Sequence, residues 1–300
     1  MFQTEDVAER LRSADLAALG ITEADRRQVR AAVAALSGDD LRRIAATADR
    51  LADRVGRIDG MAPGFFDDLP DEPGRPRGVL ALLALITTTA EVRAAHAARG
   101  ISPEESASGL ADLGQQLSVH RLVFGEFGLH TQNWMTVAWS GAMFWLGRLQ
   151  FNILPRPAGA TTERDWVIST HIPRTGGLDP AAVDDAFARA ADFFGRHFAD
   201  HPADHFHCDS WLLDPQLAAR LAPAGNMATF QRRWTLFGEG VAADEDPMFF
   251  VFNRRPPLPD PATLPRETSL QRAIVDHWAA GGHWSRWQGL AGLAGAGPRG

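Results

Sequence analysis

The chain has 300 residues, a hydrophobic content of 45% and a formal net charge of -7, as expected for a soluble globular protein with room for two domains. This negative charge disfavours nucleic acid and anionic membranes as main partners. Lysine and tyrosine are absent, which excludes a lysine Schiff base, a P-loop lysine and a tyrosine general acid. The single cysteine, Cys208, excludes an internal disulfide and suits a reducing compartment.

The N-terminal segment and the longest apolar run both favour a cytoplasmic location. The first residues, MFQTEDVAERLRSADLAALG, are charged and lack the apolar core of a signal peptide. The run VLALLALI at 79–86 is far too short to cross a bilayer. We therefore expect a cytoplasmic protein with no membrane partner.

Residues 1 to about 130 show the periodicity of helices. Apolar side chains recur every three or four positions from Leu41 to Ile58, which forms one apolar stripe. The string SPEE at 102–105 is a capping box, in which Ser102 is the N-cap and Glu105 bonds back to it. These patterns predict an all-helical N-terminal domain over residues 1–135.

Beyond about residue 145 the period changes to two, which is typical of strands. Single strands are predicted at 148–154, 166–172 and 205–211, and paired strands at 227–237 and 248–253. Helices are predicted at 180–198, 215–221 and 269–282, the first with Asp179 as N-cap. The order predicts an α+β domain over 136–290, a mixed β-sheet flanked by helices, followed by a flexible tail at 291–300.

A glycine turn, HIPRTGGLDP at 171–180, joins a predicted strand to the start of a predicted helix. The positive end of a helix attracts phosphate, and glycines let a ligand approach the backbone closely. Asp179 opposes this, because an aspartate N-cap occupies one amide and adds a negative charge. Arg174 can offset that charge by pairing with phosphate. The turn therefore predicts either a phosphate site or simply a well-capped helix.

Several strings resemble the GNAT-like C-terminal domain of a bacterial acyltransferase-like family whose members also carry a helical N-acyltransferase domain. They are LGRLQFNILP, STHIPRTGGLDP, HCDSWLLDPQLAARLAPAGNMATFQRRW and LPRETSLQRAIVDH. The resemblance implies an enzyme, an acyl-CoA-dependent N-acyltransferase. It would move an acyl group, such as acetyl, from acetyl-CoA or another acyl-CoA to an amine of a small molecule or peptide. It gives no oligomeric state.

The resemblance also assigns the glycine turn to the pyrophosphate of coenzyme A. The residues implied at the cofactor are Ile172, Arg174, Thr175, Gly176, Gly177 and Leu178. Family members typically carry Gln or Arg, two spacers, Gly, one spacer, and then Gly or Ala. Arg174 and Gly177 match the first and fourth positions, whereas Asp179 departs from the sixth.

Acyl transfer to an amine needs a neutral amine, a stabilised oxyanion and a proton for the leaving thiolate. By resemblance, strands 166–172 and 205–211 flank the thioester, which places His171, His207, Asp209 and Ser210 near the chemistry. We expect His171 to be a base, His207 and Asp209 to be a base with its orienter, and Ser210 to protonate the thiolate. Glu126 is a candidate for binding or deprotonating the acceptor. Each of these side chains also fits a structural role.

Two alternatives come from other functional classes. Residues 197–207, HFADHPADHFH, hold four histidines with zinc-like spacings, which makes a metal-dependent hydrolase conceivable. The chain has no H-E-x-x-H motif and Pro202 interrupts the helix, so we expect no metal. The other alternative is a non-catalytic GNAT-like protein that binds a ligand or partner. A turn closed by its own side chains would favour it.

Overall fold

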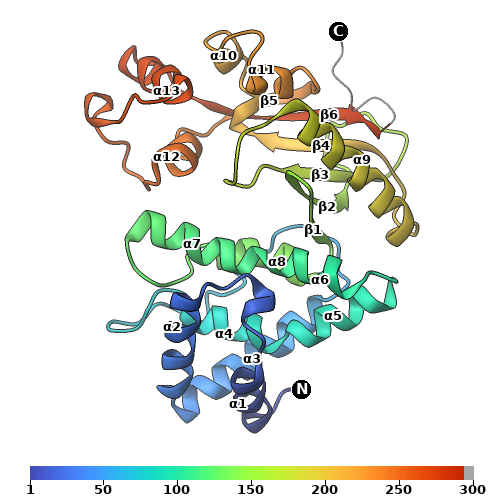
Figure 1. The fold of residues 1–300 in the computed structure, drawn as a ribbon, viewed down its shortest axis with the longest axis vertical. Helices are drawn as coiled ribbons and strands as arrows, with labels where there is room; N and C mark the ends of the chain where they lie inside the picture. Colours follow the sequence, from blue (N-terminus) through green and yellow to red (C-terminus); the bar gives the residue numbers. More distant parts are fainter. Residues whose placement is uncertain (294–300) are drawn as a thin grey trace. The chain divides into compact units, whose positions relative to one another are not determined.

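The computed structural model describes residues 1–293 of the chain, which divide into two compact units, Met1–Trp145 and Leu146 onward. The division falls within β1 (Met143–Leu146). The first unit is helical and the second contains sheet and helices, so the predicted α+β class is confirmed (Figure 1).

The N-terminal unit packs its helices around an apolar helix, α4 (Val79–Thr87), whose residues are all buried. The other helices of this unit are α1 (Thr4–Ser13), α2 (Glu23–Ala34), α3 (Gly38–Arg54), α5 (Thr89–Ala98), α6 (Pro103–Leu110), α7 (Asp112–Phe124) and α8 (Gln132–Trp139). The predicted capping box at Ser102 and Glu105 is present at the start of α6. No single helix in the described part of the chain is long and apolar enough to cross a membrane. The bent pair α4–α5 meets that test only when its two helices are taken together.

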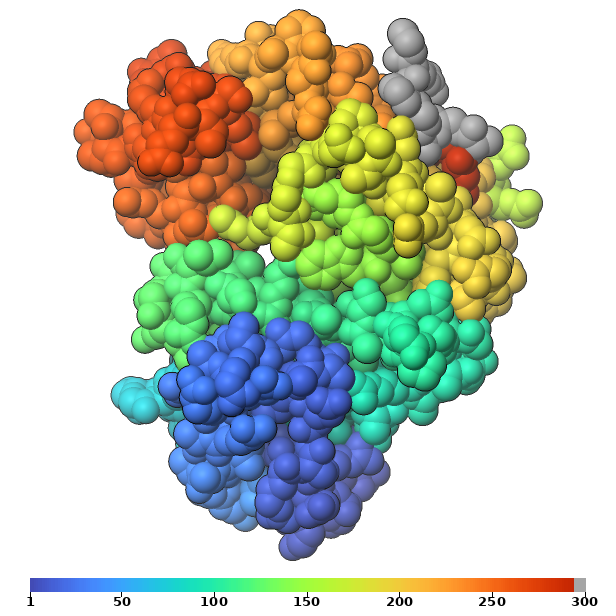
Figure 2. All heavy atoms as spheres, viewed as in Figure 1, coloured from blue at the N-terminus to red at the C-terminus, as the bar shows by residue number. Residues whose placement is uncertain are grey.

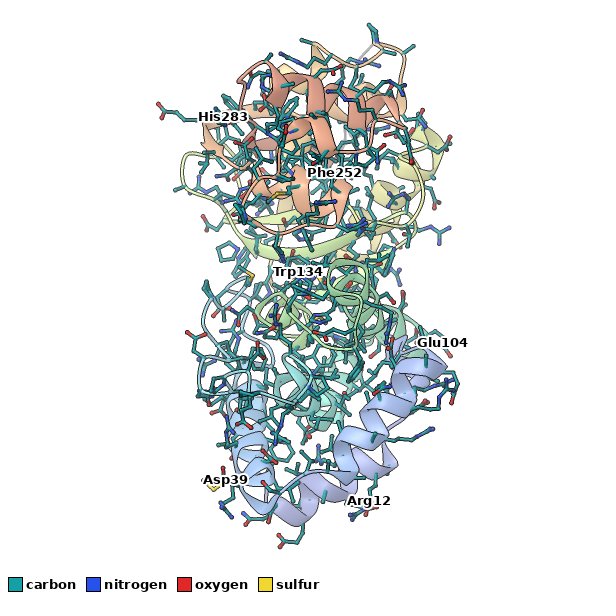
Figure 3. The ribbon with its side chains drawn as sticks, turned by 90° about the vertical axis from the view of Figure 1, so that its left-hand side faces the viewer. Arg12, Asp39, Glu104, Trp134, Phe252 and His283 are labelled. Atoms are coloured by element: carbon teal, nitrogen blue, oxygen red, sulfur yellow. The ribbon has the colours of Figure 1, made fainter. Side chains whose placement is uncertain are left out.

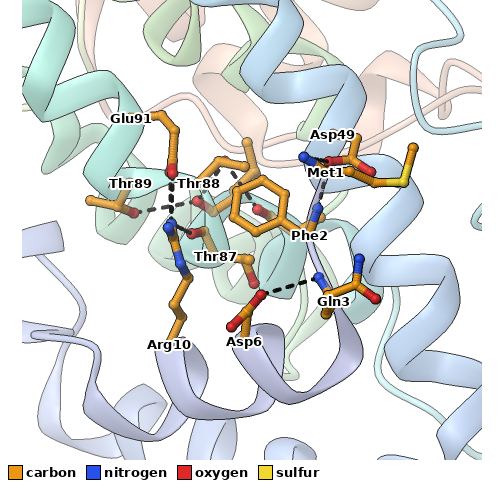
Figure 4. A network of polar contacts seen from close by, with 12 residues as sticks. Met1, Phe2, Gln3, Asp6, Arg10, Asp49, Thr87, Thr88, Thr89 and Glu91 are labelled. Atoms are coloured by element: carbon orange, nitrogen blue, oxygen red, sulfur yellow. Dashed lines mark hydrogen bonds and ion pairs between the residues drawn. The ribbon is translucent and has the colours of Figure 1, made fainter.

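A polar network fastens α1 to the helices beside it (Figure 4). Arg10 donates to both carboxylate oxygens of Glu91 at 2.8 Å and to the carbonyl of Thr87 at 3.0 Å. The same guanidinium stacks over the ring of Phe2, 4.7 Å from its centroid. The backbone amide of Phe2 in turn donates to Asp49. One ion pair and these hydrogen bonds therefore fix the position of α1 and the residues before it.

The C-terminal unit is built on a mixed sheet of six strands in the order β1-β2-β3-β4-β6-β5. Its strands after β1 are β2 (Leu149–Pro155), β3 (Trp166–His171), β4 (Ala203–Ser210), β5 (Thr235–Ala242) and β6 (Ser285–Gly292). Only β3 and β4 among the described pairs run parallel, and the other pairs are antiparallel. The helix α9 (Pro180–His197) is the crossover between those two parallel strands.

Helix α9 covers one face of this sheet, and its apolar residues pack against it. The ring of Phe187 lies 5.7 Å from that of Phe151 on β2 and 4.6 Å from that of Phe206 on β4, measured between centroids. In the space-filling view the atoms of α9 (yellow) form the outer surface over that face (Figure 2). The predicted start of α9 is confirmed, with Asp179 as N-cap and Pro180 in the first turn.

Two predicted strands near the end of the chain are wrong. Residues 248–253 belong to a helix, α12 (Glu245–Phe252), which ends at Asn253 in the left-handed conformation. Residues 227–237 are divided between α11 (Asn226–Gln231) and the start of β5. The remaining helices, α10 (Pro215–Ala218) and α13 (Ser269–Ala279), lie where helices were predicted.

The predicted tail also differs from the structure where it can be compared. Ala291 and Gly292 are the last residues of β6, which lies between β4 and β5. Residues 294–300 of that prediction lie outside the described residues. Strand β6 therefore completes the sheet. The side chain of His283, just before β6, lies at the surface of this unit. The side chain of Phe252 lies among packed side chains (Figure 3).

Candidate active site

A row of polar side chains crosses the sheet face that lies opposite α9. Side chains alternate between the two faces of a strand, and residues paired across strands share a face. The pairs Asn152↔Ser169 and Ser169↔His207 therefore place three strands' polar residues on one side. The row consists of Gln150 and Asn152 on β2, Ser169 and His171 on β3, His207 and Asp209 on β4, and Gln288 on β6.

Two histidines in this row are each oriented by a side-chain amide from a neighbouring strand. The Nε2 atom of His171 lies 2.6 Å from Oδ1 of Asn152. The Nδ2 group of Asn152 donates to the carbonyl of Ile153 at 3.1 Å, which fixes the amide with its oxygen toward the histidine. An amide oxygen only accepts, so His171 carries its proton on Nε2 and its lone pair on Nδ1. In the same way, Nε2 of His207 lies 3.1 Å from Oε1 of Gln288.

Both imidazoles are held in the neutral form. Burial, and after it the positive charge of a protonated His207, lower the pKa of His171 to about 3. Burial also lowers the pKa of His207, although Gln288 and Asp209 act in the opposite direction. At neutral pH each ring is therefore an uncharged group that can accept a proton.

The parallel strands β3 and β4 stop pairing close to these histidines. Their register runs from Trp166↔Ala203 to Ser169↔His207, with an irregularity between Trp166 and Ile168. His171 lies two residues beyond the last pair, and β4 continues to Ser210. The strands therefore have unpaired backbone groups toward each other at their carboxyl ends, next to the polar row.

The glycine turn follows β3 directly, and it is open. Gly176 has a φ of +71°, and a Cβ added at Gly176 or Gly177 would meet no atom within 4 Å. The carbonyls of these two glycines accept hydrogen bonds from Arg148, at 2.9 and 2.7 Å. Arg174 donates to the carbonyl of Phe249 on α12 at 3.1 Å. The turn is thus held from outside by Arg148 and through its own Arg174, which bonds to α12, and no side chain of the turn bonds back across it.

The other residues of the predicted cofactor turn differ in exposure. Thr175 is exposed, Leu178 is buried, and Ile172 packs against the apolar cluster that contains Trp211 and Met248. Asp179 accepts from the amide of Ala182, as an N-cap does. The structure therefore brings the turn and His171 together at one end of β3.

Three predicted catalytic residues have partners that the sequence did not reveal. Asp209 pairs with Arg286 at 3.1 Å, whereas His207 bonds to Gln288, so the predicted hydrogen-bonded pair of His207 and Asp209 is not formed. The hydroxyl of Ser210 accepts from the amide of Leu212 and caps the short turn after β4. Glu126 is exposed in the helical unit, between α7 and α8.

The histidine-rich segment does not form a cluster. His201 and His205 each lie about 3 Å from the adjacent aspartate, at 2.9 and 3.0 Å. Within residues 1–293 no three His, Cys, Asp or Glu side chains come together in an arrangement that could hold a metal ion. On the opposite face of the sheet, burial raises the pKa of the Cys208 thiol, so this thiol stays protonated.

Sequence reasoning missed the residues that orient the site, which are Asn152, Gln288 and Arg148. The alternating strand pattern at 148–154 is the one available signal, since it places Asn152 two positions from Gln150 on a single face. No local pattern connects Gln288 with His207 or Arg148 with the glycine turn, because these contacts depend on pairings that are distant in sequence.

Comparisons with known proteins cover nearly the whole chain. Residues 13–141 match the N-acyltransferase N-terminal domain, and residues 143–291 match the GNAT-like C-terminal domain. A solved acyltransferase in complex with decanoyl-CoA and teicoplanin is 30% identical with a TM-score of 0.76, and the match covers 93% of this chain and 86% of that one. No curated protein matches the chain.

Two further solved structures are similar. An acyltransferase in complex with decanoyl-CoA is 27% identical with a TM-score of 0.76, over 97% of this chain and 100% of that one. An acyltransferase mutant in complex with octanoyl-CoA is 29% identical with a TM-score of 0.78, over 93% of this chain and 86% of that one.

Proposed function

Because the chain belongs to the N-acyltransferase family that joins an N-acyltransferase N-terminal domain to a GNAT-like C-terminal domain, we propose that it acylates an amine of a glycopeptide-like acceptor. It is an acyl-CoA-dependent N-acyltransferase, with acyl-CoA as co-substrate. The proposal of a glycopeptide-like acceptor rests on one observation. Over 93% of its length the chain is similar to an acyltransferase bound to decanoyl-CoA and teicoplanin. Medium-length acyl chains, of the octanoyl and decanoyl class, are the proposed donors.

The pyrophosphate of the donor is proposed to bind at the glycine turn of the GNAT-like unit. Three observations support this: the turn begins an 18-residue helix, its glycines face open space, and its carbonyls already have partners. The amides of Thr175, Gly176, Gly177 and Leu178 would donate to the phosphate oxygens. The openness of the turn disfavours the non-catalytic alternative. Arg174 adds positive charge at the rim of the site.

The thioester is proposed to lie where β3 and β4 separate, facing His171. The amine nitrogen attacks the thioester carbon and forms a tetrahedral oxyanion, which unpaired backbone amides of the separated strands can stabilise. The C–S bond then breaks, and the nitrogen loses one proton while the sulfur gains one. The Nδ1 atom of His171 is the proposed proton acceptor, because Asn152 holds the proton of the ring on Nε2.

The low pKa of His171 limits what this base can do. An ordinary alkylammonium has a pKa of about 10, as lysine does. An imidazole with a pKa of about 3 therefore does not deprotonate it. The acceptor therefore has to reach the site as a neutral amine. His171 takes the proton only after attack, when the nitrogen has become strongly acidic. The buried uncharged side chains around His171, which are Gln150, Asn152, Ser169 and His207, also disfavour a charged amine.

The remaining polar residues have proposed supporting roles. His207 is a second neutral imidazole on the same face, and it can take up the proton and pass it to water while Gln288 holds its ring in place. Ser210 remains a prediction for protonating the departing thiolate, because its hydroxyl caps the turn after β4 and strand alternation places it on the face opposite His171. Asp209, paired with Arg286, would present a carboxylate to the acceptor. Glu126 remains a prediction for acceptor binding.

The test is a donor and acceptor comparison with the purified full-length chain. Acetyl-, octanoyl- and decanoyl-CoA are each supplied with a glycopeptide that bears a primary amine and, separately, with a simple dipeptide. Released CoA is followed with a thiol reagent and the product by mass spectrometry. The proposal predicts acylated glycopeptide and a higher kcat/KM for the two longer donors.

The matched variants are His171→Ala and His201→Ala, of which only the first removes a proposed catalytic group. Loss of a general base lowers kcat by roughly 10²–10⁴-fold. The His201 variant should keep the activity of the wild type. A preference for acetyl-CoA, or acylation of the dipeptide in preference to the glycopeptide, would contradict the proposed substrate class.

A further inference from the structure

Arg148 lies in the tight turn between β1 and β2 and reaches across to the glycine turn. It follows Gly147, whose φ is +70°. Its Nε donates to the carbonyl of Gly177 at 2.7 Å, and its Nη2 donates to the carbonyl of Gly176 at 2.9 Å. One planar guanidinium therefore holds two consecutive carbonyls, 28 and 29 residues away in sequence.

These two hydrogen bonds determine where the amides of the turn point. In a trans peptide unit the C=O and the next residue's N–H are coplanar and point in opposite directions. Because the carbonyls of Gly176 and Gly177 point toward Arg148, the amides of Gly177 and Leu178 point away from it. Within residues 1–293 neither amide has a protein acceptor, and the space around both glycines is open.

Arg148 also provides a positive charge that no carboxylate within residues 1–293 neutralises. Both of its acceptors are neutral carbonyls, and its Nη1 atom is buried without a hydrogen-bond partner. Burial lowers the pKa of Arg148, but a guanidinium stays protonated at neutral pH. This charge lies behind the turn and opposes the negative charge of Asp179 at the helix start.

We propose that Arg148 is the positioning residue of the pyrophosphate turn, and that it fixes the amides of Gly177 and Leu178 toward the phosphate oxygens of acyl-CoA. The inference rests on the proposed function of the turn and adds a residue from outside it. Arg148 acts through the backbone and does not need to touch the donor. Its effect is therefore confined to donors that carry a pyrophosphate.

Two donors separate this role from a general structural role. Decanoyl-CoA carries the pyrophosphate, and decanoyl-pantetheine carries the same thioester without it. In Arg148→Ala we expect the KM for decanoyl-CoA to rise roughly tenfold, as for the loss of a charged hydrogen bond, with little change in kcat. The kcat/KM for decanoyl-pantetheine should stay at the wild-type value. Arg232→Ala is the control, because Arg232 also donates to a backbone carbonyl, that of Pro223.

Arg148→Lys tests the geometric part of the inference. Lysine keeps the charge but is a point donor that cannot span two carbonyls. We therefore expect the KM of the lysine variant to remain several-fold above the wild type. A lysine variant with the wild-type KM would contradict the claim that one guanidinium must bond both carbonyls. Equal losses with both donors, or no loss with decanoyl-CoA, would overturn the inference. A wild-type enzyme that is inactive with every acyl-CoA would instead refute the proposed function.

Discussion

The hydrogen bond between Asn152 and His171 gives a direct test of which histidine is the base. The substitution Asn152→Asp places a carboxylate where the amide oxygen lies 2.6 Å from Nε2 of His171. An adjacent opposite charge shifts a pKa by about 1–3 units, upward in the case of a histidine. The pKa of His171 should therefore rise from about 3 toward the range of roughly 4–6. The protonated base is inactive, so activity should be lost at low pH.

The assay measures kcat/KM from about pH 5 to pH 8 and takes the ratio of variant to wild type. The ionisation of the acceptor amine cancels in this ratio, since it is common to both proteins. We expect a constant ratio above about pH 7 and a fall toward pH 5. Thermal melts show at which pH values the variant is folded, because its second carboxylate oxygen would face the carbonyl of Ile153.

The matched control is Gln288→Glu, which makes the same change beside His207. If His171 is the base, the pH profile of the control should follow the wild type. A fall at low pH in the control alone would assign the base to His207. A flat ratio in both variants would refute the use of either imidazole as a proton acceptor.

Two further predictions concern stability. Asp244→Ala should lower the free energy of unfolding by about 2–4 kcal/mol, because Asp244 accepts from Trp278 Nε1 at 2.7 Å and from the amide of Trp284 at 2.8 Å; an unchanged urea midpoint would contradict this. Burial lowers the pKa of both His96 and His120 from 6.5 to about 4. The unfolded chain therefore binds more protons below pH 6.5, and each histidine should remove roughly 2 kcal/mol of stability by pH 5. Urea midpoints that stay constant from pH 7 to pH 5 would refute that reasoning.

The sequence predicts well the parts of the fold that local patterns specify. Capping residues such as Ser102 and Asp179 satisfy amides within one turn, so their helices begin where the sequence indicates. The segment 248–253 shows the opposite case. An apolar run of that length fits a strand or a buried helix equally well. The acidic first turn at Glu245 and the left-handed Asn253 mark it as a helix.

The prediction of a flexible tail is wrong at Ala291 and Gly292, because glycine occurs both in flexible segments and where close packing leaves no room for a side chain. A glycine-rich segment suggests flexibility by composition, yet Gly289, just before the predicted tail, lies within β6 and is required by packing. A Cβ there would lie 2.8 Å from the Cβ of Trp234 and 3.1 Å from a methyl group of Leu213. Strand β6 forms by pairing with β4, which is about 80 residues away in sequence, so local sequence carries no sign of it.

The candidate site also contains residues that local sequence order predicts and residues that it does not. Residues that follow β3 directly, from His171 to Leu178, were found because the strand–turn–helix order is local. Their orienting partners come from β2, β6 and the β1–β2 turn, and depend on strand register. The partner of His207 likewise comes from β6, whereas the sequence offers only Asp209, which lies two residues away on the same strand face.

The binding of acyl-CoA at the glycine turn is the central claim, and Gly177 offers the most direct test. A Cβ at this position would meet no atom within 4 Å, so Gly177→Ala is a neutral control. Gly177→Asp adds a carboxylate at the proposed phosphate position, and its Cβ likewise meets no protein atom within 4 Å. Calorimetric titration with decanoyl-CoA should give binding to the wild type and to the alanine variant, and a loss of roughly tenfold or more in the aspartate variant. Equal affinity in all three proteins would contradict the account.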